Sequence, residues 1–239
     1  MAAGPPVGRD VPASQTLSRG IRVLEVLADA GESLTIDDVA GRLEVHRSVA
    51  YRLVRTLEHH GLVVRDSSGR IELGARLAAL AAGVTRDLQA QALPELTAVA
   101  NDLGMTCFLS LLDRDEAITI ASIEPRHAVA SVAQRPGARH PVTVGAPGKA
   151  ILAQVPLDQW PDGVGTGLVE EVRVVGTQGY ATSHDEVIRS VQSVAVPLAL
   201  RDRPPAALAV VHVVDSTDPR RVAERLSRSA DAIRTALQG

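Results

Sequence analysis

Apolar residues in the first third of the chain recur at helical spacing in three consecutive segments. The first predicted helix begins at Ser14 or Thr16 and ends just before Gly31, which is a typical stop signal. The second begins after Thr35, whose side chain can cap the helix together with Asp38 three positions on. These local signals place two short helices before residue 46.

The third segment, residues 46–61, has two sharply different faces. On a helical wheel its apolar residues fall within an arc of about 140°, and its polar residues fill the opposite arc. Gly61 supplies the stop signal. The apolar set is Val49, Ala50, Leu53, Val54 and Leu57, and the polar set is Arg47, Ser48, Tyr51, Arg52 and Arg55. The segment therefore predicts an amphipathic helix with a strongly basic exposed face.

The second and third helices and the residues after them form a recognisable sequence of elements. Two short helices joined by about three residues, the second of them basic outside, are typical of a helix-turn-helix. Residues 62–73 then hold two short β-prone runs around a polar Ser-Gly turn, which predicts a hairpin. Arg65 and Arg70 lie beside its tip. A hairpin in this position is typical of a wing that touches phosphates or the minor groove.

A further apolar stripe predicts an amphipathic connecting helix over residues 75–90. Its members are Leu77, Leu80, Ala81, Val84 and Leu88. The stripe can pack either on a second subunit or on its own domain, and the pattern alone leaves both open. A second subunit would suit a protein that presents two helices to two DNA half-sites.

The rest of the chain, from about residue 91, has a mixed α/β pattern. Helices are predicted over residues 93–103, from Pro147 to residue 153, and over residues 219–237. Strands are predicted over residues 105–112, 117–123, 128–133, 194–200 and 206–214. Because helices lie before and after an apparently antiparallel sheet, the expected fold class is α+β.

Composition and charge narrow the classes of function. The 239-residue chain is 45% hydrophobic but only 2% aromatic, so it should bury a sizeable aliphatic core. Its net charge is −3, yet residues 46–70 carry five arginines against Glu58 and Asp66, a local net charge of +3. A basic patch on a mildly acidic body is the electrostatic pattern of a local anion-binding face.

Several classes are excluded by what the sequence lacks. Cys107 is the only cysteine, so a disulfide within the chain and a cysteine-based zinc site are ruled out. No run approaches the ~18 apolar residues of a membrane span, and the N-terminus has no signal-peptide pattern. We therefore expect a cytoplasmic protein without a metal or cofactor, whose residues 1–13, rich in Ala, Gly and Pro, are disordered.

These motifs resemble those of the IclR-type (isocitrate lyase regulator) transcription factors. The resemblance is carried in the N-terminal part by residues 17–25, 34–43, 47–57 and 61–74, and in the C-terminal part by residues 141–153, with Gly148, Lys149 and Ala150, and 179–197. It covers nearly all of residues 15–237. It implies a winged helix-turn-helix domain over residues 14–74, a linker and dimerisation helix over residues 75–90, and a GAF-like effector-binding domain over residues 91–239.

The resemblance also implies partners and sites. Such a protein binds a double-stranded DNA operator as a homodimer or homotetramer, more often as a repressor than as an activator, and responds to a small molecule, often an organic acid. The candidate DNA contacts are Arg19, Arg47, Ser48, Tyr51, Arg52, Arg55, Arg65 and Arg70. The candidate effector contacts are Gly145, Ala146, Pro147, Gly148, Ser183 and Ser193.

Several residues depart from the family pattern. Glu44 stands where glycine is usual, which costs on the order of 1 kcal/mol if its φ is positive. His46 replaces a frequent proline, Ser190 replaces a usual glycine, and Ser183 and Ser193 replace a typical Asp and Cys. Pro147 removes one backbone N–H from the loop that would face a ligand carboxylate. The stretch between residues 157 and 176 is shorter and Gly-rich, where a helix and a strand are usual.

Three alternatives stay open at the level of sequence. The effector half either binds a small molecule or has lost that response, in which case the protein is a DNA-binding regulator without an effector. The Gly-rich run at residues 145–150 either binds an anion at a helix N-terminus or is plain structure, and it lacks the residues of a phosphate-binding loop. His212 either lines a pocket or is a hydrogen-bonded core residue. An enzyme is not expected, because no G-x-S-x-G elbow surrounds Ser183 or Ser193.

Overall fold

A computed structural model describes residues 14–127, 132–213 and 217–238. The chain divides into two compact units, Met1–Val84 and Thr85–Gly239. Residues 1–13, expected to be disordered, lie outside the described residues, as does most of the strand expected over residues 128–133.

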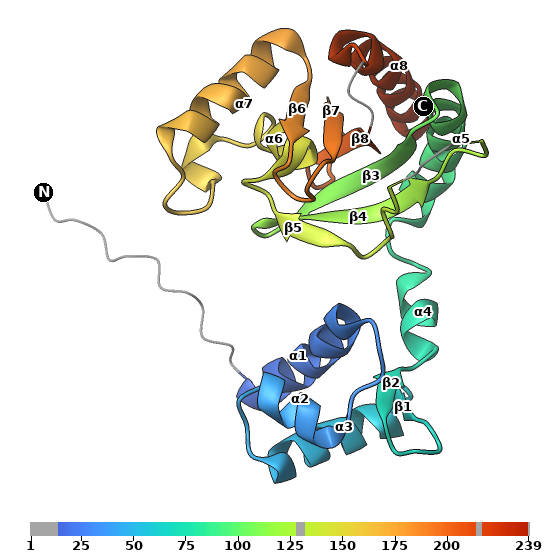
Figure 1. The fold of residues 1–239 in the computed structure, drawn as a ribbon, viewed down its shortest axis with the longest axis vertical. Helices are drawn as coiled ribbons and strands as arrows, with labels where there is room; N and C mark the ends of the chain where they lie inside the picture. The colour runs from blue at the N-terminus through green and yellow to red at the C-terminus, as the bar shows by residue number, and fades with distance from the viewer. Residues whose placement is uncertain (1–13, 128–131, 214–216, 239) are drawn as a thin grey trace, which may run out of the picture. The chain divides into compact units, whose positions relative to one another are not determined.

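Among its described residues, the first unit packs three helices with a two-stranded hairpin, and a short fourth helix follows the hairpin (Figure 1). The helices are α1 (Gln15–Ala30), α2 (Ile36–Arg42) and α3 (Arg47–His59), and the strands are β1 (Val63–Arg65) and β2 (Ile71–Leu73). Ser14 caps α1, and Thr35 and Asp38 form the predicted reciprocal capping box on α2. The three predicted helices and the hairpin are confirmed.

The core of this unit is aliphatic and joins the hairpin to the helices. Val23, Val39, Val54 and Ile71 are fully buried. Ile71 of β2 also exchanges two backbone hydrogen bonds with Leu34, at 2.7 and 2.9 Å. The start of β2 is therefore fixed to the segment between α1 and α2, while the turn residues 66–69 are exposed.

The turn between α2 and α3 contains the unfavourable backbone conformation expected at Glu44, whose φ is +54°. A side chain with a Cβ is strained in this left-handed region. We therefore expect Glu44→Gly to stabilise the first unit by about 1 kcal/mol. Hydrogen exchange of buried α3 amides would measure the change, because it reports the opening of this unit alone. Glu44→Ala is the matched control: it removes the charge but keeps the Cβ, and an equal stabilisation would contradict the argument.

The connecting segment is not the single helix that its apolar stripe predicted. The structure has α4 (Arg76–Ala81), a turn, and then α5 (Arg86–Leu103), which begins after Thr85 at a φ of +50°. The stripe is also divided in burial: Leu80 and Val84 are 61% and 58% exposed, whereas Leu88 is fully buried in the second unit. The left-handed residue breaks the helical repeat, so the stripe belongs to two elements.

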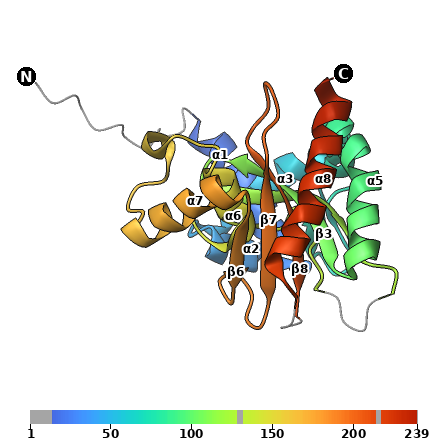
Figure 2. The same ribbon diagram turned by 90° about the horizontal axis from the view of Figure 1, so that it is seen from above.

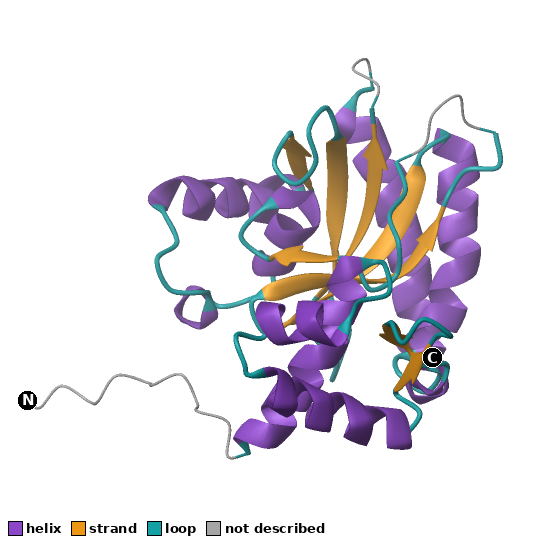
Figure 3. Cartoon of the chain, turned by 60° about the horizontal axis from the view of Figure 1, so that its bottom comes forward, coloured by secondary structure: helices purple, strands orange, loops and turns teal. Residues whose placement is uncertain are grey.

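The second unit is a curled antiparallel sheet between two helical layers (Figures 2 and 3). The strand order is β5-β4-β3-β8-β7-β6. The strands are β3 (Thr106–Asp113), β4 (Glu116–Ile123), β5 (Arg139–Pro141), β6 (Ala181–His184), β7 (Gln192–Leu198) and β8 (Ala206–His212). α5 and α8 (Pro219–Gln238) lie side by side on one face, and α6 (Gly145–Leu152) and α7 (Thr166–Gln178) cover the other.

Alternation along the central strands explains the two cores. Leu208 and Val210 of β8 face the α5/α8 layer, whereas Ala207 and Ala209 face α6. Because the residues on the second face are small, α6 can lie close to the sheet, and all eight of its residues are buried. Because α6 packs closely on the sheet, its N-terminus lies at the edge of the cavities described below.

The structure corrects the expectation for the Gly-rich stretch and adds two short strands. Residues 166–178 form the helix α7, which the glycines at its N-terminal end had obscured. β5 and β6 have three and four residues and a polar composition, so periodicity did not reveal them. The α+β fold class is confirmed. Among the described residues, no helix has both the length and the apolar character that a membrane crossing requires.

Candidate functional site

The polar face of α3 is exposed over its whole length. Arg47, Ser48, Tyr51, Arg52 and Arg55 are all solvent-exposed, and the opposite side of the helix packs into the core through Ala50, Leu53, Val54 and Leu57. The wheel therefore predicted the orientation of this helix correctly. The face that it leaves to solvent offers three guanidinium groups and two hydroxyls.

The first turn of α3 is held by local contacts. His46 is the N-cap, and its Nδ1 accepts a hydrogen bond from the Ser48 amide at 3.3 Å and lies 2.9 Å from Ser48 Oγ. Arg47 forms an ion pair with Asp37 of α2 at 2.9 Å, and both side chains are more than 60% exposed. Such a surface pair contributes little to stability, so Arg47 can exchange Asp37 for another anion at small cost.

Arg52 and Arg55 differ from Arg47, Arg65 and Arg70, whose guanidinium groups have partners within the chain. In the described part of the chain, neither guanidinium has a hydrogen-bond or ion-pair partner. Arg52 also lines a hollow of about 280 Å³ between α1 and α3, together with Arg19 of α1 and the threonines Thr16 and Thr56. The Arg19 guanidinium and the Thr16 hydroxyl at this hollow form a site that suits a phosphate group.

The hairpin arginines have internal partners. Arg65 donates to Glu58 at 3.3 Å and lies over the ring of Tyr51, with 5.8 Å between the guanidinium carbon and the ring centroid. Arg70 donates to the backbone oxygen and hydroxyl of Ser33, at 2.5–3.1 Å. Arg65 therefore orients Tyr51, and Arg70 anchors the hairpin to the segment before α2.

The tip of the hairpin is closed by an acidic residue. Asp66 accepts hydrogen bonds from the amides of Ser68 and Arg70, at 2.9 Å, and from the Ser68 hydroxyl at 2.6 Å. The Ser68 side chain, followed by the Arg70 amide, lowers the pKa of the Asp66 carboxyl. The tip therefore carries a negative charge beside the basic face, and it is preorganised by its own turn.

The anchoring role of Arg70 leads to a test. We expect Arg70→Ala to lower the free energy of opening of the hairpin by about 1 kcal/mol, because three hydrogen bonds to Ser33 are lost. Hydrogen exchange of the β1 and β2 amides measures this opening. Arg55→Ala is the control, since that side chain has no described partner and its loss should leave the exchange unchanged. Equal exchange in both variants would contradict the anchoring role of Arg70.

In the second unit, the predicted effector residues lie around two neighbouring cavities. The larger has a volume of about 570 Å³ and is lined by Lys149, Glu171, Val174, Val175, Gln178, Ala181, Thr182, Ser183, His184, Glu186, Gln192, Ser193, Val194 and Pro219. The smaller, of about 40 Å³, contacts Gly145, Pro147, Ser183 and Ser193 and is covered by Glu186, Val187 and Ile188. The first has the size of a ligand pocket, and the second holds about three waters.

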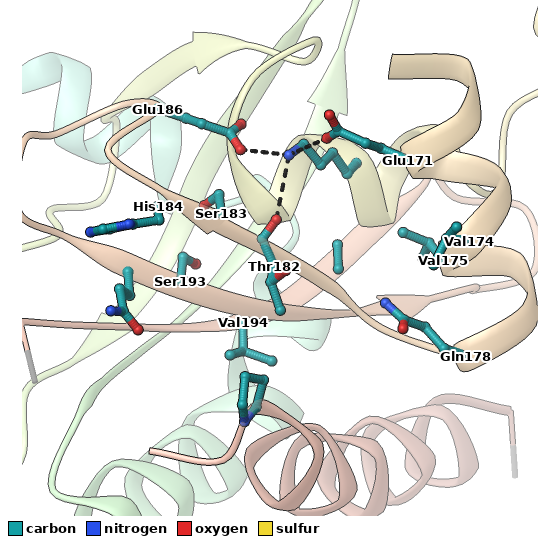
Figure 4. A pocket seen from close by; sticks show the side chains of 14 residues that line it. Glu171, Val174, Val175, Gln178, Thr182, Ser183, His184, Glu186, Ser193 and Val194 are labelled. Carbon is teal, nitrogen blue, oxygen red and sulfur yellow. Dashed lines mark hydrogen bonds and ion pairs between the residues drawn. The ribbon is translucent and has the colours of Figure 1, made fainter. Parts of the chain in front are cut away.

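Lys149, the only lysine of the chain, is the central charge of this region. Figure 4 shows the carboxylates of Glu171 and Glu186 pointing toward one another, with dashed lines running from both to the group between them. The Lys149 Nζ lies 2.5 Å from a Glu171 oxygen and 2.6 Å from a Glu186 oxygen, and it donates to the backbone oxygen of Thr182 at 3.4 Å. Burial by itself would lower the pKa of Lys149, but the hydrogen bonds that it donates to the two carboxylates outweigh burial and raise that pKa. A permanently charged lysine is not a Schiff-base nucleophile.

The N-terminus of α6 already holds a carboxylate. The Gly145 amide donates to Glu186 Oε2 at 2.8 Å, while Glu186 Oε1 binds Lys149. Pro147, in the same turn, has no N–H to offer. Ala146 and Gly148 are buried, and neither belongs to the lining of the two cavities. Four of the six predicted effector residues therefore lie together around the smaller cavity, namely Gly145, Pro147, Ser183 and Ser193. The other two, Ala146 and Gly148, pack in the interior.

The remaining candidate chemical groups are engaged or buried. Ser193 Oγ donates to the Val210 oxygen at 2.8 Å, so its hydroxyl is committed to the sheet. Burial, the largest cause, raises the pKa of the Cys107 thiol. His212 is buried in β8. Within the described residues, no cluster of His, Cys, Asp or Glu has the arrangement of a metal site.

Sequence reasoning missed the two acidic partners of Lys149. Glu186 lies 37 positions from Lys149 and Glu171 lies on α7, a helix that was not expected. The only available signal was the lysine itself, since a buried ammonium group requires a carboxylate partner. The sequence did not say which carboxylate fills that role.

Comparison with known proteins adds two domain matches. Residues 16–67 match the IclR helix-turn-helix domain, and residues 81–160 match the bacterial transcriptional regulator IclR C-terminal domain. The HTH-type transcriptional regulator XynR of Escherichia coli is 26% identical over 95% of this chain and 98% of its own length. Together the matches include both units.

Solved structures agree over nearly the whole chain. A transcriptional regulator from Alicyclobacillus acidocaldarius is 29% identical, with a TM-score of 0.81 over 93% of this chain and 98% of that one. An IclR homologue from Microbacterium hydrocarbonoxydans, crystallised with 4-hydroxybenzoate, is 25% identical, with a TM-score of 0.79 over 94% and 99% of the two chains.

Proposed function

This chain belongs to the IclR family of DNA-binding transcriptional regulators, and from that premise we propose that it is a dimeric repressor controlled by a small carboxylic acid. The observation that carries the proposal is the exposed face of α3, on which Arg52 and Arg55 have no partner among the described residues. A buried apolar face and an unpaired basic face together make a helix that can enter the major groove.

The basic residues take different roles in this proposal. Arg52 and Arg55 contact base edges, because a free guanidinium can form a bidentate pair with guanine. Arg19, Arg47, Ser48 and Tyr51 contact phosphates, with Arg19 acting in the hollow that it shares with Arg52. Arg65 positions Tyr51 and Arg70 anchors the wing, so both act mainly through other residues.

A homodimer is supported by apolar residues that the first unit leaves uncovered. Leu17 and Ile21 of α1 are 64% and 49% exposed, and Leu80 and Val84 are 61% and 58% exposed. A second copy would cover these side chains and present two α3 helices to two half-sites. Analytical ultracentrifugation of the full chain tests whether it forms a dimer and whether two dimers join into a tetramer.

The domain roles follow the predicted division, with one change. Residues 14–74 bind DNA, residues 75–90 connect, and residues 91–239 bind the effector, but the connection consists of α4 and the start of α5. The place of action is the cytoplasm, where the operator is. Repression follows if the bound dimer blocks access to a promoter.

A binding assay tests the DNA-reading part. Fluorescence anisotropy with DNA flanking the protein's own gene should show preference for a pseudo-palindrome over random DNA of equal length. Specific sites typically bind ~10³-fold or more tightly than random DNA at physiological salt. Equal affinity for the two DNAs would refute a sequence-specific regulator.

The effector part rests on the cavities beside Lys149. A positively charged lysine and the N-terminus of α6 are groups that bind a carboxylate. The relative from Microbacterium hydrocarbonoxydans was crystallised with 4-hydroxybenzoate, which belongs to this chemical class. We therefore propose an organic acid with a short apolar or aromatic body as the effector.

A second candidate is the same regulator without a small-molecule response. It is favoured by Pro147, which lacks an N–H, and by the 40 Å³ volume of the smaller cavity. A thermal-shift screen of organic acids separates the two, because a ligand at 100 times its Kd stabilises the protein by ~2.7 kcal/mol. A hit that also changes operator affinity would exclude the candidate without a response.

A further inference from the structure

The smaller cavity is closed by a piece of the chain itself. Residues 185–190 join β6 to β7 and cross the N-terminal end of α6, and Glu186, Val187 and Ile188 line the cavity from that side. A Cβ added to Gly145 would lie 2.9 Å from Val187 Cγ2, which shows how closely the segment sits on the helix. We call residues 185–190 the strap.

The strap imitates an organic acid in its chemistry. The Glu186 carboxylate binds the Gly145 amide with one oxygen, at 2.8 Å, and Lys149 with the other, at 2.6 Å. Val187 and Ile188 follow directly and line the smaller cavity together with Phe108 and Val211. A carboxylate bound at two points beside a short apolar body is how a free acid would lie in this site.

The remaining contacts of the strap lie at its ends, where the Asp185 amide donates to the Val191 oxygen at 3.1 Å. Every residue from 184 to 190 is exposed, and Val187 and Ile188 are 48% and 44% exposed although they line the cavity. Its two ends, Asp185 and Ser190, have φ values of +61° and +60°, which a residue with a Cβ adopts only at a cost. Asp185 also accepts a hydrogen bond from the Ser190 amide, so the strap is closed on itself.

Lifting the strap would join the two cavities. Ser183, Glu186 and Ser193 line both the 570 Å³ and the 40 Å³ cavity, so this group of side chains forms the partition between them. With Glu186 displaced, the Gly145 amide would lose its partner next to Lys149, which already lines the larger cavity and keeps its contact with Glu171. The open pocket would then lead to an anion site formed by this amide and Lys149.

We propose that the strap is a built-in competitor of the effector: Glu186 occupies the position of the effector carboxylate, and Val187 and Ile188 occupy that of its apolar body. The proposal rests on the effector control proposed above and adds that Glu186 sets the effector concentration needed for binding. An acid binds by displacing Glu186 from Gly145 and Lys149. The apparent affinity is therefore the intrinsic affinity multiplied by the fraction of molecules in which the strap is lifted.

The test uses the full chain and two charge-matched variants. Glu186→Gln weakens the contact of the strap with Lys149, whereas Glu170→Gln removes an exposed carboxylate of α7 that pairs with Arg173 outside both cavities, and it leaves the strap in place. Isothermal titration with benzoate, 4-hydroxybenzoate and acetate gives the affinities, and benzamide is the uncharged analogue. Hydrogen exchange of the amides of residues 145–148 reports lifting of the strap without any ligand.

We expect Glu186→Gln to bind benzoate about tenfold or more tightly than the wild type, with faster exchange at the α6 N-terminus. Glu170→Gln should show neither effect, and benzamide should not distinguish the variants. Equal or weaker benzoate binding by Glu186→Gln, unchanged exchange, or no binding of any tested acid to this variant would overturn the proposal. If the variant binds acids more tightly but the acids do not change its affinity for the operator, the role of the strap as a competitor is supported and the proposed effector control is refuted.

Discussion

Arg52→Ala and Arg55→Ala are each expected to weaken operator binding by about 1–3 kcal/mol, which is a ~5- to 150-fold loss of affinity. Both side chains project from the solvent face of α3 and, in the described part of the chain, have no partner that competes with DNA. Their removal cannot disturb an internal ion pair, so the loss reports the DNA contact itself. Fluorescence anisotropy measures the affinity of each variant for the operator and for random DNA.

The pattern across two DNAs separates the kinds of contact. A residue that reads a base loses specific affinity and relaxes the preference at one position, whereas a phosphate contact weakens both DNAs alike and reduces the salt slope by about 1. We expect the first pattern for Arg52 and Arg55 and the second for Arg19 and Arg47. Arg173→Ala, on α7, is the control because that side chain pairs with Glu170 at 2.7 Å and should not affect DNA binding. A loss below ~0.3 kcal/mol for Arg52 or Arg55 would show that the residue is not a contact.

The DNA-reading unit was predictable because its determinants are local. The capping box of Thr35 and Asp38 spans three positions, and the two faces of α3 follow from helical periodicity. The strain at Glu44 could be stated in advance as a condition on φ, which the structure meets. What the sequence did not show is that Arg70 reaches Ser33, 37 positions away, and that Arg65 stacks on Tyr51.

The effector site was only half predictable, for the same physical reason. Periodicity located α6 and the central strands, but the contact between Lys149 and Glu186 also spans 37 positions. The predicted donors at the α6 N-terminus are present, yet their occupancy depends on where the strap folds back. α7 was missed because the glycines before it suggest a turn, although the helix supplies Glu171. Contacts between distant segments follow from tertiary packing, which a single sequence does not specify.

Gly148→Ala is the second change with a large expected effect. A Cβ on Gly148 would lie 2.1 Å from the Val142 backbone oxygen and 2.8 Å from its carbonyl carbon. Backbone atoms cannot rotate away, so α6 itself must move from the small alanines of β8 on which it sits. We expect the second unit to lose about 3 kcal/mol of unfolding free energy, at the upper end for an overpacked core.

The matched control for Gly148→Ala uses the other helix on the same face of the sheet. Gly176 of α7 is exposed and has nothing within 4 Å of its would-be Cβ, so Gly176→Ala should stabilise the unit by about 0.5–1 kcal/mol. Urea unfolding followed by the fluorescence of Trp160, the only tryptophan, measures both variants in the second unit. If the two stability changes have opposite signs, the loss at Gly148 comes from the close approach of α6 to Val142 and not from helix propensity. If Gly148→Ala were neutral, α6 could shift freely, and the fixed positions of Gly145 and Lys149 on which the effector site depends would lose their structural basis.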